Sequence, residues 1–415
     1  MKFLRNFFDK AYEKAGDKFH PVVESFDTIL FTPNHTTKSG AHIRDAVDLK
    51  RTMMFVILAM IPCLLFGMWN VGEQHFVMMN ETVSFWDKFL HGAIKVLPII
   101  VISYGVGLTV EFIFGIINGH SLHEGFLVSG MLIPLIMPVD TPLWMIAVAT
   151  VFGVVIGKEV FGGTGMNVLN VALTTRAFLF FAHPTSMSGD TVWTSGLGGM
   201  KDLAKTGDPL ATKIVKGTET VDAYSGATPM GDLASTAGKS EEVVTSIMSK
   251  FQEGGANDIS HSLFGDYLGS IGETSTYAIL LGLAFLLITR IASWRVVVSF
   301  FAGGFVMATI FNLVAGDNAY MALPALHQLL LGGFMFGMVF MVTDPVTAAQ
   351  TNKGKFYYGF LAGFIGILIR VANPAYPEGI MLGILIANVC APLIDHMVLN
   401  GNIKKREKRI AKAKA

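Results

Sequence analysis

Long runs of apolar residues recur ten times along this chain and limit what it can fold into more than any other feature. Each run is about 15 to 26 residues long, close to the roughly 20 residues that a helix needs to cross a bilayer. Charged residues make up only 15% of the chain, against roughly 25% in soluble domains. The runs therefore predict an all-α polytopic membrane protein with about ten transmembrane helices.

The predicted spans fall into two groups of five, separated by a long polar stretch. They lie at residues 53–71, 92–117, 125–139, 143–158, 165–183, 275–292, 296–316, 325–343, 356–371 and 379–398. The resulting domains are an N-terminal interfacial segment (1–51), a first five-helix unit (52–183), an intervening segment (184–272), a second five-helix unit (273–398) and a basic tail (399–415). A polar stretch precedes the first run, so we expect no signal peptide.

The two groups of spans resemble each other. The third span leads into Met137-Pro-Val-Asp-Thr-Pro142 and the eighth into Met341-Val-Thr-Asp-Pro-Val346, so each ends on an acid beside a proline. Because five spans per group is an odd number, two copies must be inverted in the membrane. Interrupted helices at matching places of inverted repeats point to a binding site near the midplane. The alternative is that glycine and proline are simply frequent in membrane helices.

Charge bias predicts the orientation. Lysines and arginines cluster on one side of the ten spans, at Arg44, Lys50, Arg51, Arg290, Arg295, Lys353, Lys355 and the tail. The loop 72–91 on the other side carries three acids. Positive residues mark the cytoplasmic side, so we expect both termini to be cytoplasmic and the intervening segment to lie outside. The formal net charge of zero gives no reason to expect a nucleic-acid partner.

The intervening segment contains the heptapeptide Asp222-Ala-Tyr-Ser-Gly-Ala-Thr228. We expect Thr228 to present an exposed hydroxyl, with an uncrowded approach beside Gly226 and Ala227 and a carboxylate nearby. The heptapeptide resembles the D-x-x-[ST]-G-A-T sequence of proteins that carry FMN as a phosphoester on the last threonine. This resemblance implies covalent FMN on Thr228, with Asp222, Ser225, Gly226 and Ala227 recognised by a flavin transferase. An ordinary Ser/Gly/Thr turn is the alternative.

A second polar stretch lies between the fourth and fifth spans. It contains glycines that permit close backbone approach and two amides, which can hydrogen-bond an isoalloxazine or a quinone. The candidate contacts for a noncovalent riboflavin are Gly163, Thr164, Gly165, Asn167 and Asn170. The glycine spacing matches neither a dinucleotide fingerprint nor a P-loop. A re-entrant turn capped by Asn and Thr is the alternative interpretation.

Ionisable residues within or at the edge of predicted spans are functional candidates, because burying a charge in lipid is costly. They are Glu111, Arg176, Glu273, Asp344, Arg370 and Asp395. Carboxylate oxygens suit a small cation, and no span supplies enough Lys or Arg to neutralise Glu111, Asp344 and Asp395 together. Charge pairing is the alternative. Only Cys63 and Cys390 are present, which gives no disulfide framework and no cysteine metal site, and we assign no catalytic residue.

Several stretches together resemble one family over essentially the whole chain. They are His42–Arg51, Lys158–Gly165, Ser225–Thr228, Ile291–Arg295 and Asn373–Gly379. The family comprises the B subunits of the bacterial Na⁺-translocating NADH:quinone oxidoreductases. The related D subunits of the Rnf ferredoxin:NAD⁺ complexes share the membrane plan and the flavin motif, but usually lack the long N-terminal segment.

This resemblance implies a redox-driven sodium pump of the bacterial inner membrane with five partner subunits, in which electrons from NADH pass through FMN and riboflavin to ubiquinone. For Glu111, Asp344 and Asp395 it implies a role in Na⁺ movement. It also implies that Gly107 and Glu111 lie in the quinone region, where this chain has Gly107-Leu108 in place of adjacent glycines. A non-redox channel or carrier would have no use for a flavin-bearing loop. A structural scaffold would not need acids at broken helices.

Overall fold

The computed structural model describes residues 49–118, 125–206, 208–216, 224–236, 239–316, 318–373, 376 and 379–414, together with scattered residues before Leu49. Within these ranges all regular structure is helical. Six described helices are long and apolar enough to cross a membrane: α2 (Leu49–Met79), α3 (Phe85–Asn118), α5 (Leu143–Gly157), α13 (Trp294–Val314), α17 (Gly354–Ala372) and α18 (Ile380–Lys414). Three shorter apolar helices are α4 (Gly125–Leu135), α6 (Val171–Ala182) and α12 (Thr276–Ile288).

These helices confirm the prediction of an all-α polytopic membrane protein, and each of the ten predicted spans coincides with helical structure. The eighth span differs from the others because it is divided into short pieces. These are α15 (Ala325–Leu330), α16 (Phe334–Phe336) and a π-helical turn over Gly337–Met341. Gly332, with φ of +66°, separates α15 from α16, in the left-handed region that glycine adopts without strain.

The predicted ends of several spans are wrong. The helices α2 and α3 extend so far that the expected loop at 72–91 shrinks to 80–84, with Asn80 at φ +55° in the turn. The helix α18 continues to Lys414, so the expected tail is a helical extension of the last span. Hydropathy detects only the apolar part of a helix, and these helices continue with polar residues.

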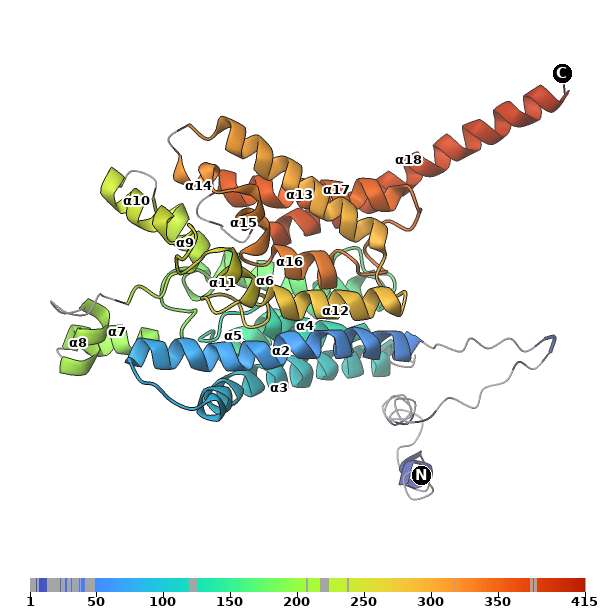
Figure 1. Cartoon of the computed structure of the whole chain (residues 1–415). Coiled ribbons are helices and arrows are strands. Elements are labelled where there is room, and N and C mark those ends of the chain that lie inside the picture. Colours follow the sequence, from blue (N-terminus) through green and yellow to red (C-terminus); the bar gives the residue numbers. More distant parts are fainter. Residues whose placement is uncertain are drawn as a thin grey trace.

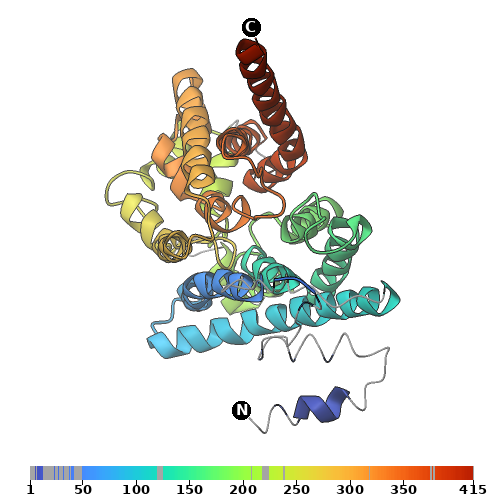
Figure 2. The ribbon, with the colours of Figure 1, turned by 90° about the vertical axis from the view of Figure 1, so that its right-hand side faces the viewer.

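The packing of the helices follows the two groups of spans (Figure 1). In the first group α3 packs against α2, α4 and α5, and α5 against α6; in the second group α13 packs against α17, and α17 against α18. Between the groups, α2 contacts α12 and α6 contacts α18, while α18 runs out beyond the bundle (Figure 2). The first helix of one group thus contacts the first helix of the other group, and the last helix contacts the last. A pseudo-twofold axis between the groups requires this arrangement. The inversion of the two units stays a prediction.

Glycines allow two of these helix pairs to approach closely. A Cβ added at Gly303 of α13 would overlap the carbonyl oxygen of Phe360 in α17. A Cβ added at Gly107 of α3 would overlap the ring of Phe126 in α4. Small residues at helix contacts are a general means of packing in membranes, so both glycines have a packing role.

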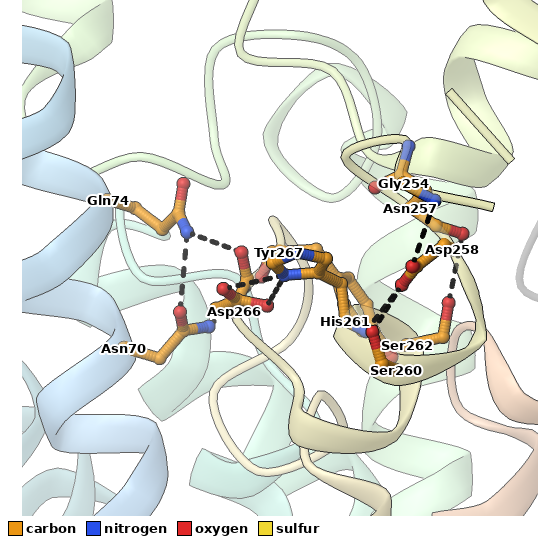
Figure 3. A network of polar contacts seen from close by, with 10 residues as sticks. All are labelled: Asn70, Gln74, Gly254, Asn257, Asp258, Ser260, His261, Ser262, Asp266 and Tyr267. Carbon is orange, nitrogen blue, oxygen red and sulfur yellow. Dashed lines mark hydrogen bonds and ion pairs between the residues drawn. The ribbon is translucent and has the colours of Figure 1, made fainter. Parts of the chain in front are cut away.

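Between α6 and α12, the described residues of the intervening segment form a 3₁₀ turn at Pro184–Ser186 and five short α-helices. They are α7 (Leu197–Thr206), α8 (Pro209–Lys216), α9 (Pro229–Ala234), α10 (Glu241–Ser249) and α11 (Ile259–Phe264). Figure 3 shows how the end of this segment is fastened to α2. The amide of Asn70 donates to the carbonyl oxygen of Tyr267 at 3.0 Å, and that of Gln74 donates to the carbonyl oxygen of Asp266 at 3.2 Å.

Candidate functional site

Thr228 is the N-cap residue of α9. Its Oγ1 accepts a hydrogen bond from the Gly231 N–H at 3.1 Å, and Pro229 occupies the first helical position, where its missing N–H costs nothing. Thr228 is half-buried, so the structure leaves part of this residue exposed. As an acceptor in the cap, Oγ1 is held in one position while the hydroxyl keeps its own proton.

The residues before Thr228 are held by their neighbours. Gly226 has φ of +70°, and a Cβ at this position would overlap the carbonyl oxygen of Asp190, so no other residue fits without a shift. The hydroxyl of Tyr224 is 3.0 Å from Thr194 Oγ1, and burial raises the pKa of this phenol. The Ala227 N–H donates to Ser225 Oγ at 3.4 Å. Asp222 lies outside the described residues.

A small pocket adjoins Thr228. It is lined from α9, from the stretch before α12 and from the break between α15 and α16, by residues that include Thr228, Tyr267, Ser270, Glu273, Gly332 and Gly333. The pocket therefore joins the heptapeptide to the interrupted eighth span, two features that are about one hundred residues apart in sequence.

Two buried arginines lie behind this pocket. Arg176 of α6 is 1% exposed and forms an ion pair with Glu273 at 3.6 Å. Arg370 of α17 is fully buried and donates to the carbonyl oxygen of Gln328 at 2.5 Å, close to Gly332. Charge pairing, the alternative to an ion-conducting role, thus accounts for Arg176 and Glu273.

A larger pocket lies between the two groups of spans, with a cavity volume of about 80 Å³. Its walls include Thr164, Asn167 and Asn170 from the first group and Thr343 and Asp344 from the second. Three of the five candidate riboflavin contacts and one of the three candidate acids thus line one cavity. We name it the inter-repeat pocket.

Asn170 and Asp344 connect the two sides of the inter-repeat pocket. Asn170 caps α6, with its side-chain oxygen accepting from the Leu173 N–H at 3.2 Å. Its Nδ2 lies 3.4 Å from Asp344 Oδ2. Asp344 also accepts from the Val346 N–H at 3.0 Å and from Thr347 Oγ1 at 3.1 Å. The carboxylate is therefore held by neutral donors, and no ion pair to it occurs among the described residues.

The other two candidate riboflavin contacts, Gly163 and Gly165, do not line the inter-repeat pocket. Their φ angles of +91° and +93° shape the turn that carries Thr164. The Thr164 hydroxyl oxygen is buried and has no hydrogen-bond partner in the structure. A buried polar atom of this kind needs a partner, and here it faces a cavity that offers room for one.

Sequence reasoning missed Lys158. This lysine lines the inter-repeat pocket, is 4% exposed and forms a buried ion pair and hydrogen bond with Glu111 of α3. The expectation that lysines and arginines leave the three acids unneutralised is therefore wrong for Glu111. The signal was present, because Lys158 is the last residue of the predicted span 143–158.

The structure does not bring the three candidate acids together. Asp395 of α18 accepts hydrogen bonds from the N–H groups of Gln350 and Thr351 at 2.7 and 3.0 Å, and fastens that turn to α18. Glu111 adjoins the inter-repeat pocket only through Lys158. Gly107, expected in the quinone region, packs against Phe126. Asp344 is the one candidate acid that faces the inter-repeat pocket itself.

Comparison with known proteins identifies relatives over nearly the full length. The model of the NQR2, RnfD, RnfE family matches residues 36–404. The chain is 42% identical to the B subunit of the Na(+)-translocating NADH-quinone reductase of Stutzerimonas stutzeri and 43% identical to that of Azotobacter vinelandii, each over 97% of this chain and 98% of the relative. The protein of the same description from Chromohalobacter salexigens is 42% identical over 98% of this chain and 97% of its own.

Proposed function

The chain belongs to the NQR2, RnfD, RnfE family, and from this premise we propose that it is the membrane-embedded B subunit of a Na⁺-translocating NADH:quinone oxidoreductase. The observation that carries the proposal is the 42–43% identity to proteins of that description along nearly the whole chain. The proposed complex contains five further subunits in the bacterial inner membrane. It passes electrons from NADH to ubiquinone and exports Na⁺.

We propose that Thr228 carries FMN through a phosphoester, attached outside the membrane by a flavin transferase. The Oγ1 that would be esterified is fixed by the cap of α9 and borders a pocket. Tyr267, which is buried, also lines that pocket. Gly226 fixes the turn before Thr228, because any side chain there would meet Asp190. A flavin supplies one- and two-electron transfer.

We propose that the inter-repeat pocket binds a noncovalent riboflavin. Thr164, Asn167 and Asn170 line it and supply hydroxyl and amide groups for the polar edge of an isoalloxazine. The buried Thr164 oxygen without a partner favours a ligand over an empty cavity. The apolar walls, among them Leu132, Leu286 and Phe340, suit the ring faces.

We further propose that Asp344 is a station for Na⁺. The carboxylate lies where the eighth span ends, beside Pro345, which cannot donate a backbone hydrogen bond. Carboxylate and carbonyl oxygens bind small cations at interrupted helices. Glu111 and Asp395 have weaker support, since Glu111 is paired with Lys158 and Asp395 holds a backbone turn. Ubiquinone contact near Gly107 and Glu111 rests on the resemblance alone.

The covalent flavin is tested on the denatured polypeptide. We expect in-gel flavin fluorescence on this subunit, abolished by Thr228→Ala while the complex still assembles. Thr245→Ala changes an exposed threonine of the same segment and serves as the matched control. Fluorescence that survives Thr228→Ala would refute the attachment site. A subunit that never fluoresces in the wild type would refute covalent flavin on this chain.

The riboflavin site is tested by the noncovalent flavin that acid releases from the purified complex. Asn170→Ala and Thr164→Val should each lower the released riboflavin without changing the covalent fluorescence. Asn400→Ala, on the exposed extension of α18, should change neither. Full riboflavin content in both pocket variants would remove this assignment and leave the rest of the proposed function standing.

A further inference from the structure

A second cavity lies outside the proposed redox machinery, in a groove between α17 and α18. Its volume is about 570 Å³. The walls are apolar and come from Tyr357, Phe360 and Leu361 of α17 and from Ile394, Met397 and Val398 of α18. Three of these six side chains are exposed, Tyr357 by 64%, Phe360 by 40% and Met397 by 66%. In a protein that spans a membrane, such a face lies in lipid or against a partner.

The two ends of the groove differ in charge. Lys353, at the N-cap of α17, and Lys405 of α18 both line it, and they lie at the end where α18 leaves its apolar stretch. Neither lysine forms an ion pair with any residue that the structure describes. The groove therefore combines apolar walls with two positive charges at its polar end.

The helix α18 continues this arrangement beyond the groove (Figure 1). Ile394, Val398, Gly401, Lys405 and Lys408 follow one another at spacings of four and three residues, so they share one face of the helix. This face changes from apolar to basic at Gly401. Residues 404–414 contain seven Lys or Arg and one Glu, and basic clusters directly after a membrane helix attract anionic lipid headgroups.

The position of Lys353 is fixed by α18 itself. Asp395 holds the turn before α17 through the N–H groups of Gln350 and Thr351 and through Thr351 Oγ1 at 2.5 Å. Lys353 follows two residues later. Because the turn is fastened to α18 one helical turn from Val398, the first lysine is held close to the second without making a contact of its own.

We propose that the groove between α17 and α18 binds an anionic phospholipid, with its acyl chains along the apolar walls and its phosphate between Lys353 and Lys405. A phospholipid matches both parts of the groove, since it joins apolar chains to a negative charge at the membrane boundary. The site is independent of the redox function.

Native mass spectrometry of the detergent-purified complex tests this proposal, with dioleoylphosphatidylglycerol and dioleoylphosphatidylcholine as probes. The double variant Lys353→Gln/Lys405→Gln should bind phosphatidylglycerol about thirtyfold more weakly, since each basic residue near the headgroup contributes roughly a fivefold gain in affinity. Phosphatidylcholine binding should not change. Lys353→Arg/Lys405→Arg should retain most of the affinity, and Lys205→Gln/Lys239→Gln, on the intervening segment, is the matched control.

Unchanged phosphatidylglycerol binding in the Gln variant, or equal binding of both lipids by the wild type, would overturn the proposal. Where the double variant fails to assemble, the single variants should each lose about fivefold by the same reasoning. A photoreactive benzoylphenylalanine in place of Val398 identifies the occupant directly. An adduct with lipid supports the proposal, whereas an adduct with another subunit overturns it.

Discussion

Asp140 and Asp344 stand at matching places of the two groups of spans, each beside a proline, but their surroundings are different. Asp140 follows α4, an uninterrupted helix, and its carboxylate accepts from the Gly196 N–H of the intervening segment at 2.7 Å. Asp344 follows a span divided into α15, α16 and a π-helical turn, and it lines the inter-repeat pocket. One acid is closed off by a loop, and the other faces a cavity.

The difference shows how one sequence pattern serves two purposes. In the first group the backbone at the end of α4 is satisfied by the chain itself, since the N–H groups of Ile271 and Gly272 donate to the carbonyl oxygens of Met137 and Leu135. In the second group the donors to Asp344 are an amide, a hydroxyl and one backbone N–H. Neutral donors of this kind place no counter-charge beside the carboxylate of Asp344.

The largest expected effect concerns the charge balance beside the inter-repeat pocket. Lys158→Met removes the buried partner of Glu111 and should destabilise the subunit by about 3–5 kcal/mol, because a buried carboxylate then loses its counter-charge. The apparent midpoint of thermal unfolding of the purified complex measures this loss. The double variant Lys158→Met/Glu111→Met should recover most of it.

The control for that prediction is the more exposed pair of Lys88 and Glu73, each 20% exposed, near the ends of α3 and α2. Lys88→Met should cost no more than about 1 kcal/mol, as is typical of ion pairs near the surface. Equal destabilisation by Lys88→Met and Lys158→Met would mean that the Glu111–Lys158 pair behaves like an ion pair near the surface. The surroundings of the inter-repeat pocket would then differ less from those of Asp140.

A smaller difference in stability is expected between glycine variants at the helix contacts of the two groups. Gly303→Ala should destabilise more than Gly107→Ala, because the added Cβ meets the backbone oxygen of Phe360 in one case and a side-chain ring in the other. Overpacking typically costs about 1–3 kcal/mol, and a ring yields more easily than a helix backbone. Adding Phe126→Leu should rescue Gly107→Ala. The reverse order of the two glycine variants in thermal unfolding would contradict this account of the packing.

The smallest effect concerns the intervening segment that closes off Asp140. Asp258 caps α11, and hydrogen bonds from the His261 N–H and the Ser260 hydroxyl lower the pKa of its carboxyl to about 2. A lowered folded-state pKa stabilises α11 above the unfolded value near 4 and loses that effect as the pH falls through about 2. Hydrogen exchange of residues 259–264 should therefore rise in Asp258→Ala at neutral pH. Unchanged exchange would show that the cap contributes nothing.

Much of the fold could be predicted from the sequence, because long apolar runs have few solutions in a membrane. All ten predicted spans coincide with helices, and the polar ends of α2, α3 and α18 were missed because hydropathy carries no signal there. The division of the eighth span at Gly332 was also missed. Residues distant in sequence surround this break, since a Cβ at Gly333 would meet Glu273 and a Cβ at Gly332 would meet Arg370, and the local pattern does not reveal them.

The site was predicted less completely. Thr164, Asn167, Asn170 and Asp344 were singled out as separate groups, and the structure brings them to one pocket. The pairing of Lys158 with Glu111 joins residues 47 positions apart, and no spacing rule reveals such a contact. The N-cap role of Thr228 was not predicted, because this residue was interpreted only as part of the flavin motif. Thr228-Pro229 is nevertheless a helix-start signal.

Sodium uptake by proteoliposomes that contain the complex tests the central claim most directly, through Asp344→Asn and Asp140→Asn compared side by side. Each change keeps the volume of the side chain and removes its charge. Asp344→Asn should lower Na⁺ uptake and the Na⁺ stimulation of quinone reduction about tenfold, the usual cost of losing one charged contact, with normal flavin content. Asp140→Asn should leave both close to wild type. Wild-type uptake by Asp344→Asn, or an equal loss in the two variants, would contradict the claim that only the acid facing the inter-repeat pocket handles the ion.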